Sequence, residues 1–337
     1  MTESARISPA STIGCIAVIG TGLIGTGWVA RYLQNGFRVM AWDPAPGFAG
    51  VLRERLQVIF ARMQIEPARQ THLLDALQIA DSAAEAAEAA DFVQENGPEV
   101  LDVKRQILHQ LAEASAPDTV IASSSSGLRM SDLQRGSASA ERLVIGHPFH
   151  PVYLLPLVEV VAGEETSDEA VMLAVDLYRS AGQSPVICPR DNTGYIGNRL
   201  QEAIFREALH MVNAGEATPE QIDAVVTLGP GLRWAFMGPF LAYHLTGGQE
   251  GIRGFFERFG DSLLEPYSRL RAPELTDQLV SRVSHDVEEA YSGRSPAQLE
   301  GWRDERLRRI LAALASAEAE ADESSNSVPN TEHSGGP

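Results

Sequence analysis

The stretch Cys15-Ile-Ala-Val-Ile19, followed at once by Gly20-Thr-Gly-Leu-Ile-Gly25, decides the fold that we predict. Its first five residues are apolar and partly β-branched, which indicates a buried strand. The segment Trp28-Val-Ala-Arg-Tyr-Leu33 then indicates a helix. In such a unit the glycines allow a tight turn, close approach of a bound group and close packing of helix on strand. The backbone N–H groups at the start of the helix are therefore expected to face an anion.

A carboxylate ends the next predicted strand. Gly36 ends the helix, Phe37-Arg-Val-Met-Ala-Trp42 is typical of a strand, and Asp43 follows it. A carboxylate at this position accepts hydrogen bonds from the adenosine ribose and repels a 2′-phosphate, so we predict that the cofactor is NAD and not NADP. The alternative is an ordinary glycine turn beside an unrelated aspartate. The residues expected to contact NAD here are Gly20, Gly22, Leu23, Ile24, Gly25 and Asp43.

Strand and helix patterns alternate over the first half of the chain. Short apolar runs predict further strands at 92–93, 120–122, 143–145 and 157–161, and residues 51–90 have a helical pattern. Alternation of this kind is typical of βαβ units in a mostly parallel sheet. Beyond the segment 185–191 the patterns are helical, at 198–213, 219–228, 273–291 and 295–314. We therefore predict an α/β chain, with a Rossmann-type doubly wound sheet over residues 13–190 and an all-helical domain over 191–316.

Composition limits the partners of the chain and the structure of its ends. Among 337 residues, 45 acids face 27 bases, and the formal net charge is −18. Nucleic acids and anionic membrane surfaces attract basic patches, so neither is an expected partner. The chain has no apolar run of about 18 residues, no signal-peptide pattern and only two cysteines, from which we expect a cytoplasmic protein. We expect disorder in residues 1–12 and in the acidic tail 317–337.

Two polar loops follow predicted strands and contain the candidate catalytic groups. They are Ser123-Ser-Ser-Ser126-Gly127 and Gly146-His-Pro-Phe-His-Pro151, and Glu159 lies on the next strand. A histidine at a strand end, with a carboxylate on the neighbouring strand, fits a base and the group that orients it. A structural histidine and a loop rich in helix caps are the alternatives. His147 and His150 have no third ligand at a recognisable spacing, so we predict no metal site.

The order of these motifs resembles that of the 3-hydroxyacyl-CoA dehydrogenase superfamily. The resemblance covers residues 13–260 and includes the segment Gly194-Tyr-Ile-Gly-Asn198-Arg199. Within the superfamily, three stretches are closer to the L-carnitine dehydrogenases than to the acyl-CoA enzymes. These stretches are 42–46, 146–160 and the long segment 229–238, which is rich in tryptophan, phenylalanine and methionine.

The resemblance implies a catalytic role for four residues of this sequence. At the position of His147 the family has a histidine that takes the hydroxyl proton while hydride leaves the same carbon for NAD. At the position of Glu159 it has a glutamate that orients the imidazole and stabilises its cation. At the positions of Ser126 and Asn198 it has groups that hydrogen-bond the reacting oxygen.

Further family positions concern the nicotinamide half of the cofactor. Glu99 and Lys104 match two of them, and Lys104 is the only lysine in the chain. Two departures qualify the match. His150 stands where the family usually has asparagine, and the serine loop lacks the asparagine of the acyl-CoA enzymes, so we infer no contact from either asparagine.

The sequence favours a small zwitterionic substrate over an acyl-CoA. Residues 48–90, which in the acyl-CoA enzymes form a lysine-rich hairpin, contain no lysine here. Carnitine has a quaternary ammonium, which aromatic faces bind by cation–π contacts. The candidates are Phe149, Tyr153, Trp234, Phe236 and Tyr243, with core packing as the alternative for each, and Arg233 or Arg199 for the carboxylate.

The resemblance thus implies NAD-dependent oxidation of the 3-hydroxyl of L-carnitine to 3-dehydrocarnitine. It also implies a homodimer, and the apolar stripe Leu200, Ile204, Ala208 and Met211 fits a helical interface, with packing inside the domain as the alternative. Three alternatives stay open: an L-gulonate 3-dehydrogenase of the lambda-crystallin type, a 3-hydroxyacyl-CoA dehydrogenase, and a crystallin-like structural protein that binds NAD without turnover.

Overall fold

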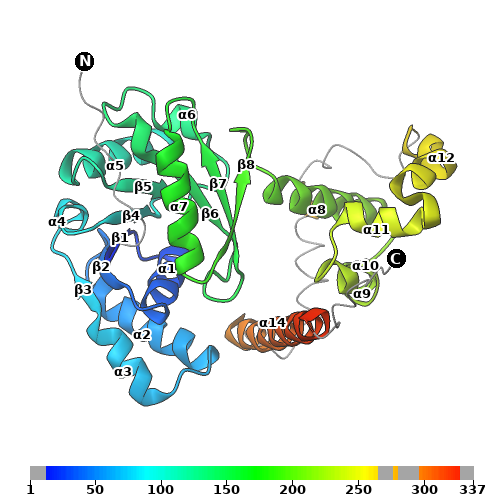
Figure 1. The fold of residues 1–337 in the computed structure, drawn as a ribbon, viewed down its shortest axis with the longest axis horizontal. Coiled ribbons are helices and arrows are strands. Elements are labelled where there is room, and N and C mark those ends of the chain that lie inside the picture. Colours follow the sequence, from blue (N-terminus) through cyan, green and yellow to red (C-terminus); the bar gives the residue numbers. More distant parts are fainter. Residues whose placement is uncertain (1–12, 265–275, 280–295, 327–337) are drawn as a thin grey trace, which may run out of the picture. The chain divides into compact units, whose positions relative to one another are not determined.

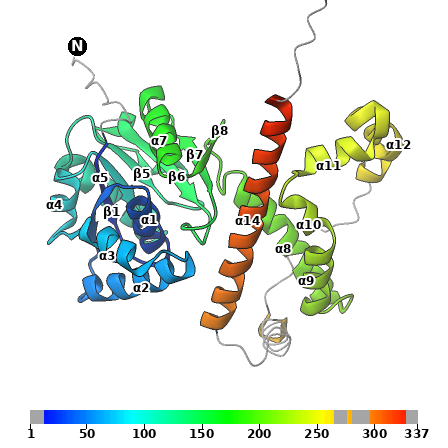
Figure 2. The same cartoon turned by 60° about the horizontal axis from the view of Figure 1, so that its bottom comes forward.

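The chain forms two compact units that divide after Leu200 (Figures 1 and 2). The computed structural model describes residues 13–264, 276–279 and 296–326. The division in the structure lies ten residues beyond the boundary expected at 190, because helix α8 (Gly197–Ala214) starts in the first unit and continues into the second. Among the described residues, no helix is both long and apolar enough to span a bilayer.

The first unit contains one eight-stranded sheet with the strand order β3-β2-β1-β4-β5-β6-β7-β8 (Figure 1). Strands β1 to β6 are parallel, β7 is antiparallel to β6, and β8 is parallel to β7. This confirms the predicted α/β class. The strands are β1 (Cys15–Ile19), β2 (Arg38–Trp42), β3 (Leu77–Ile79), β4 (Phe92–Glu95), β5 (Val120–Ser123), β6 (Leu143–Pro148), β7 (Leu157–Ala162) and β8 (Ser184–Cys188).

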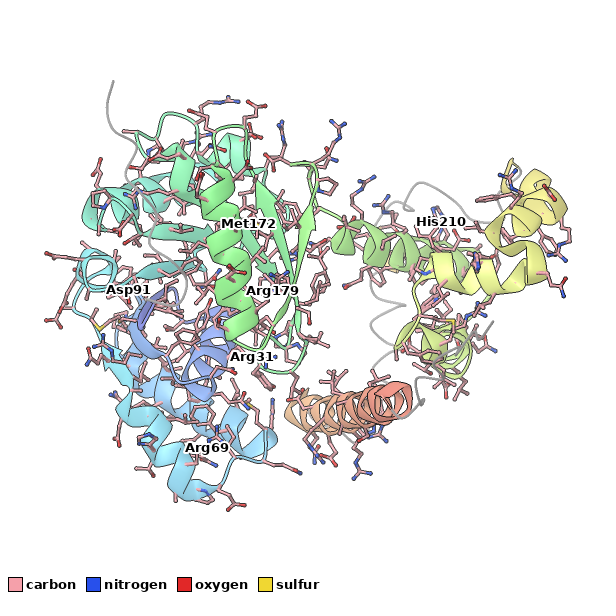
Figure 3. All side chains as sticks on the ribbon, viewed as in Figure 1. Arg31, Arg69, Asp91, Met172, Arg179 and His210 are labelled. Atoms are coloured by element: carbon pink, nitrogen blue, oxygen red, sulfur yellow. The ribbon has the colours of Figure 1, made fainter. Side chains whose placement is uncertain are left out.

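Helices cover both faces of the sheet because the strand side chains alternate. Ile16 and Val18 of β1 belong to one core, with α1, α2 and α7, whereas Ala17 and Ile19 belong to the other, with α4, α5 and α6. Met172 and Arg179 mark the exposed side of α7 (Figure 3). The helices are α1 (Leu23–Gln34), α2 (Phe48–Arg62), α3 (Pro67–Asp75), α4 (Ala83–Glu88), α5 (Leu101–Ala114), α6 (Met130–Leu133) and α7 (Asp168–Ser180), with a 3₁₀ turn at Ala140–Arg142.

Two strands of the sheet, β3 and β8, were not expected from the sequence. The expected helical stretch 51–90 is broken into α2, α3, β3 and α4. Gln64 takes a left-handed conformation (φ 59°) after α2, and α3 begins at Pro67, where proline is favoured. Strand β3 then pairs with β2 at the edge of the sheet. The second strand, β8, continues the sheet beyond β7.

The described part of the second unit is helical, as predicted. Helix α9 has the expected bounds, and the expected helix at 273–291 lies outside the described residues except for 276–279. Helix α14 continues to Asn326, past the expected start of the tail at 317, because alanine and glutamate favour a helix. Residues 1–12 and 327–337 lie outside the described residues. The elements are α9 (Pro219–Leu228), α10 (Pro230–Trp234), α11 (Pro239–Thr246), a 3₁₀ turn (Gly248–Glu250), α12 (Gly251–Leu264) and α14 (Pro296–Asn326).

Candidate active site

The glycine turn after β1 has a backbone that larger residues could not adopt. Gly20 has a φ of +85°, in the left-handed region that favours glycine. A Cβ added to Gly25 would lie 1.8 Å from the carbonyl oxygen of Gly20, so only glycine lets α1 start this close to the strand. A Cβ on Gly22 would meet nothing within 4 Å, which leaves that side open. The turn therefore has a tight inner side and an open outer side, as a pyrophosphate site requires.

Asp43 connects the end of β2 to this turn. Its Oδ2 accepts a hydrogen bond from the Thr21 backbone N–H at 2.7 Å, and its Oδ1 accepts one from the Ala45 N–H at 2.9 Å. Asp43 also lines a cavity of about 840 Å³ together with Gly20, Gly22 and the two strand ends around it. The structure thus brings the predicted carboxylate and glycines to one cavity at the carboxyl edge of the sheet.

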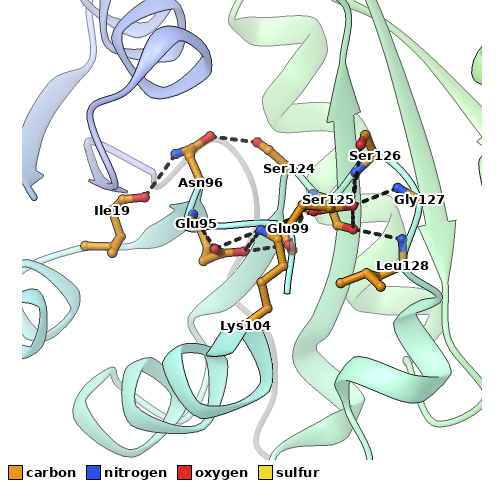
Figure 4. Close-up of polar contacts among 12 residues, drawn as sticks. Ile19, Glu95, Asn96, Glu99, Lys104, Ser124, Ser125, Ser126, Gly127 and Leu128 are labelled. Atoms are coloured by element: carbon orange, nitrogen blue, oxygen red, sulfur yellow. Dashed lines mark hydrogen bonds and ion pairs between the residues drawn. The ribbon is translucent and has the colours of Figure 1, made fainter. Parts of the chain in front are cut away.

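Glu99 holds the serine loop through one carboxylate oxygen (Figure 4). Its Oε1 accepts hydrogen bonds from the Ser125 hydroxyl at 2.7 Å and from the backbone N–H groups of Ser126 and Gly127, both at 2.9 Å. Burial raises the pKa of Glu99, but these hydrogen bonds, assisted by Lys104, outweigh burial and lower its pKa overall. Glu99 is therefore a carboxylate at neutral pH that fixes the backbone around Ser126.

A buried ion pair lies beneath this loop (Figure 4). The Lys104 ammonium is 3.0 Å from both carboxylate oxygens of Glu95, and both side chains are almost fully buried. Glu95 also accepts hydrogen bonds from the Ser123 hydroxyl, at 2.6 Å, and from the Gly97 N–H. Lys104 is 3.8 Å from Glu99. The main partner of the only lysine is thus a glutamate that the sequence analysis did not select.

Ser124, unlike Ser126, has all its hydrogen-bonding capacity in use. Its hydroxyl donates to Asn96 Oδ1 at 2.7 Å and accepts from Gln94 Nε2 at 2.9 Å and Trp28 Nε1 at 3.0 Å. The Asn96 amide donates in turn to the backbone carbonyl of Ile19. This network joins β1, β4 and the serine loop, whereas, among the described residues, the exposed Ser126 hydroxyl has a single long hydrogen bond, which it donates to Glu99 Oε1 at 3.4 Å.

His147 and Glu159 form the expected pair. They lie directly opposite each other in the β6–β7 ladder, and His147 Nδ1 is 2.9 Å from Glu159 Oε2. The other oxygen of Glu159 accepts from the backbone N–H groups of Ile196, at 3.0 Å, and Gly197, at 2.8 Å. Burial raises the pKa of Glu159, but the hydrogen bonds from His147 and the two amides lower it overall. The pair is therefore an imidazole bound to a carboxylate.

A second cavity, of about 290 Å³, lies beside this pair. It shares Asn96 and Gly97 with the larger cavity, so the two are contiguous. Its other lining residues are Ile24, Glu99, Lys104, Ser124, Ser126, His147 and Pro148. Five residues selected from the sequence, Ile24, Glu99, Lys104, Ser126 and His147, therefore line one continuous space, together with Gly20, Gly22 and Asp43 at its other end.

Asn198 and Phe149 also lie at this end of the first unit. Asn198 Nδ2 donates to the backbone carbonyl of Ser126 at 2.8 Å. The Phe149 ring is 5.0 Å from the His147 ring, and a Cβ on Gly197 would lie only 2.3 Å from Phe149. The start of α8 thus approaches both the serine loop and the histidine, which supports the sequence-based grouping.

Other predicted residues are not brought to this space by the first unit. Tyr153 is buried, with 4% of its surface exposed, in the core on the α1 and α7 side of the sheet, so the core-packing alternative describes it. Arg233, Trp234 and Phe236 belong to the second unit and are exposed there. Tyr243 packs on Phe255, with ring centroids 4.6 Å apart. The assignment of the four candidates in the second unit, Arg233, Trp234, Phe236 and Tyr243, to substrate binding stays a prediction.

Three residues at the site were missed by the sequence analysis. Glu95 and Asn96 are polar residues at the end of an apolar strand, and that change of polarity was a usable signal. Cys188 ends β8, and its sulfur is 3.7 Å from Glu159 Oε1. Nothing in the sequence around Cys188 distinguished it from a core residue. Among the described residues, no group of three potential ligands could hold a metal ion.

Comparison with known proteins shows to which family this chain belongs. The family models for the NAD-binding domain and the C-terminal domain of 3-hydroxyacyl-CoA dehydrogenase match residues 15–192 and 194–289. This chain belongs to the 3-hydroxyacyl-CoA dehydrogenase family. It is an NAD-dependent enzyme of the type that oxidises 3-hydroxy acids. This confirms the predicted fold class and the predicted cofactor.

The similar curated proteins confirm the resemblance to one subgroup. The chain is 48% identical to an L-carnitine dehydrogenase of Nocardiopsis dassonvillei, over 96% of this chain and 98% of the relative. It is 44% identical to one of Pseudomonas putida, over 91% and 96%.

Two solved structures are also similar to this member of the family. The first is a 5-formyl-3-hydroxy-2-methylpyridine 4-carboxylic acid 5-dehydrogenase, which is 28% identical with a TM-score of 0.74, over 91% of this chain and 99% of the similar chain. The second is the Escherichia coli 3-hydroxybutyryl-CoA dehydrogenase, which is 28% identical with a TM-score of 0.59, over 74% of this chain and 53% of the similar chain.

Proposed function

We propose that this enzyme oxidises the 3-hydroxyl of L-carnitine to 3-dehydrocarnitine, with NAD as hydride acceptor and His147 as general base. The observation that carries the proposed chemistry is the 2.9 Å contact between His147 Nδ1 and Glu159 at the edge of the smaller cavity. The proposed substrate rests on the names of the similar dehydrogenases, which cover nearly the whole chain.

The contact between His147 and Glu159 selects the imidazole tautomer that a base needs. A carboxylate accepts, so Nδ1 carries the proton and Nε2 keeps a lone pair. In the proposed reaction Nε2 takes the hydroxyl proton of the substrate. The imidazolium that forms is stabilised by Glu159, whose own charge is maintained by the amides of Ile196 and Gly197.

Ser126 and Asn198 are proposed to hold the reacting oxygen. Ser126 lines the same cavity as His147, and its backbone is fixed by Glu99. Asn198 reaches the Ser126 carbonyl from the start of α8. Donors that keep the hydroxyl in line with the base raise the rate by positioning and by stabilising developing charge.

The residues of the cleft fit the dinucleotide that the family uses. Gly20, Gly22 and Gly25 form the open turn for the pyrophosphate, and Asp43 is proposed to accept hydrogen bonds from the adenosine ribose. Leu23 and Ile24 start α1 beside them, and Glu99 and Lys104 line the nicotinamide end. NAD, when bound, supplies the acceptor for the hydride that leaves the substrate carbon.

Substrate recognition is proposed to use aromatic faces. A quaternary ammonium has no N–H to donate, so cation–π contacts are the means of binding it, each worth about 0.5–2 kcal/mol. Phe149 is available beside His147. Trp234 and Phe236 are further candidates, with Arg233 for the carboxylate. All three keep exposed side chains in the second unit.

We also propose that the enzyme is a cytoplasmic homodimer. Large apolar side chains are exposed on the helices of the second unit, including Ile204, Phe205, Val225 and Leu228, which are 46–77% exposed. Surfaces of this kind mark interaction sites. Analytical ultracentrifugation of the purified protein tests the dimer, and a monomer at micromolar concentration would contradict it.

The decisive experiment measures NAD reduction with four substrates in parallel. These are L-carnitine, D-carnitine, L-gulonate and 3-hydroxybutyryl-CoA. We expect kcat/KM to be highest with L-carnitine. A preference for L-gulonate or 3-hydroxybutyryl-CoA would replace the proposed substrate, and NAD binding without turnover of any of them would refute an enzymatic role for this site.

A further inference from the structure

Three charged side chains meet at the end of the cleft where His147 and Ser126 lie (Figure 4). They are Glu95, Glu99 and Lys104, two carboxylates and one ammonium, so their sum is one negative charge. Glu95 and Lys104 are buried, whereas 40% of the Glu99 side chain is exposed. Glu99 and Lys104 both line the cavity, and Glu99 is by far the more exposed of the two charges.

The ammonium is shared unequally between the two carboxylates. Lys104 lies 3.0 Å from both oxygens of Glu95 but 3.8 Å from Glu99 Oε2. Its charge is thus used mainly to compensate Glu95, which has no access to water. Lys104 compensates the negative charge of Glu99 less than that of Glu95, because its contact with Glu99 is the longer one.

The two carboxylate oxygens of Glu99 have different contacts. The hydrogen bonds from Ser125, Ser126 and Gly127 all go to Oε1. Oε2 lies 3.8 Å from the Lys104 ammonium, beyond hydrogen-bonding distance. Support of the serine loop therefore requires an acceptor at Oε1, and the full charge of a carboxylate is more than that support requires.

We propose that Glu99 is an electrostatic selector of the cofactor's oxidation state, which strengthens the binding of NAD⁺ relative to that of NADH. This rests on the proposed function, because hydride transfer near His147 requires the nicotinamide to lie in the cavity that Glu99 lines. The nicotinamide ring is cationic when oxidised and neutral when reduced. A fixed negative charge beside it therefore stabilises the oxidised form alone.

This selectivity would favour turnover in the direction of alcohol oxidation. The same carboxylate that attracts the cationic ring offers the neutral ring no comparable attraction, so the reduced cofactor leaves more readily. Glu159 does not duplicate this function, because its charge faces His147, Ile196 and Gly197 and is used by the base.

The test compares the dissociation constants of NAD⁺ and NADH in wild type and Glu99→Gln, by calorimetry and by NADH fluorescence. Glutamine can place its oxygen at Oε1 and its amide at Oε2, so loop support remains while the charge is removed. For unit charges on neighbouring groups at a half-exposed site, we expect the ratio Kd(NADH)/Kd(NAD⁺) to fall about tenfold. For a two-electron couple this raises the midpoint potential of the bound cofactor by about 30 mV.

Two further variants separate charge from structure. Glu99→Asp keeps the charge but shortens the side chain, so both affinities should fall while their ratio stays within about twofold of wild type. Asp102→Asn removes the same charge from an exposed position on α5, where 89% of the side chain is exposed. This control should change neither affinity nor ratio.

Several outcomes would overturn the proposal. If Glu99→Gln weakens both forms equally, or leaves the ratio within twofold, Glu99 is only a support for the loop. If Asp102→Asn shifts the ratio as much as Glu99→Gln, the effect is one of overall charge. Failure of wild type to bind either form would refute the proposed function itself, which is a distinguishable result.

Discussion

Replacing Glu159 with glutamine is expected to remove the base without removing the fold. Glu159 Oε1 accepts two backbone hydrogen bonds, from Ile196 and Gly197, whereas Oε2 accepts one, from His147. The amide oxygen of glutamine will therefore stay with the two backbone donors, and its NH₂ group will face the imidazole. His147 Nδ1 must then accept, which moves the ring proton to Nε2 and leaves no lone pair there for the substrate.

The expected loss in kcat is about 10³–10⁴-fold, the size of effect that a wrong tautomer has in other enzymes with a histidine base. The assay is steady-state NADH formation from L-carnitine at saturating NAD. NAD affinity, measured by calorimetry, should stay unchanged. The double variant Glu159→Gln/His147→Ala should be no slower than His147→Ala alone, because both changes disable the same group. Activity of Glu159→Gln within tenfold of wild type would refute this reasoning.

The same substitution should also change the acid stability of the protein. Because the folded-state pKa of Glu159 lies below its value in the unfolded chain, its charge stabilises the fold above that unfolded value. This stabilisation disappears as the pH falls through the folded-state pKa. Since hydrogen bonds to charged groups are stronger than neutral ones, Glu159→Gln should lose about 1–2 kcal/mol at pH ~7. A stability gap between the two proteins that does not narrow in acid would contradict this.

Three other substitutions test the cleft. Gly25→Ala should abolish NAD binding, because its Cβ would meet the Gly20 carbonyl at 1.8 Å, and retained affinity in calorimetry would count against the proposed turn. Asp43→Asn should narrow the preference for NAD over NADP about tenfold in kcat/KM, and an unchanged preference would remove Asp43 from cofactor selection. Lys104→Met should destabilise the protein by about 3–5 kcal/mol in urea unfolding, because Glu95 would be buried without its partner, and a smaller loss would mean that Glu95 is otherwise compensated.

Local chemistry made the first part of the fold predictable. The strand at Cys15–Ile19 and the helix α9 have the predicted bounds, because each combines a clear hydrophobic pattern with a clear stop signal. The long helical pattern of 51–90 hid β3, since three residues at a sheet edge are too few to show a period of two. Their strand conformation comes from pairing with β2, which is a tertiary contact and leaves no local pattern.

Site residues could be predicted from the sequence where they belong to an unusual motif. They could not be predicted where the residue type is common and has many structural roles. A glycine motif or a histidine between glycine and proline is unusual enough to be selected from one sequence. Glu95 had a weaker signal, its position at the polar end of an apolar strand, and because acids are common in this chain its importance becomes evident only from its burial beside Lys104. Tyr153 shows the reverse error: an aromatic residue near the histidine suggested ligand binding, but its ring fills the core.

The strand order explains why distant motifs form one site. From β2 through β1, β4 and β5 to β6, the carboxyl ends of the parallel strands present Asp43, Gly20, Glu95, Ser123 and His147 in spatial sequence. Neighbouring strands lie about 4.8 Å apart, so this row extends over about 19 Å, a length suited to an extended dinucleotide. The sheet thus orders the adenosine, pyrophosphate and nicotinamide ends of the proposed cofactor site.

The one reversal of direction in the sheet has a chemical consequence. A parallel strand next to β6 would begin at the opposite edge and present its first residues far from His147. Because β7 is antiparallel, it begins at the carboxyl edge, and its third residue, Glu159, lies in register with His147. The next strand, β8, is parallel to β7 and ends away from this edge, so the chain must return to bring Ile196 and Gly197 to the same carboxylate. Glu159 therefore joins the antiparallel strand to the start of α8, and the base is oriented by the same contacts that fix where the helix begins.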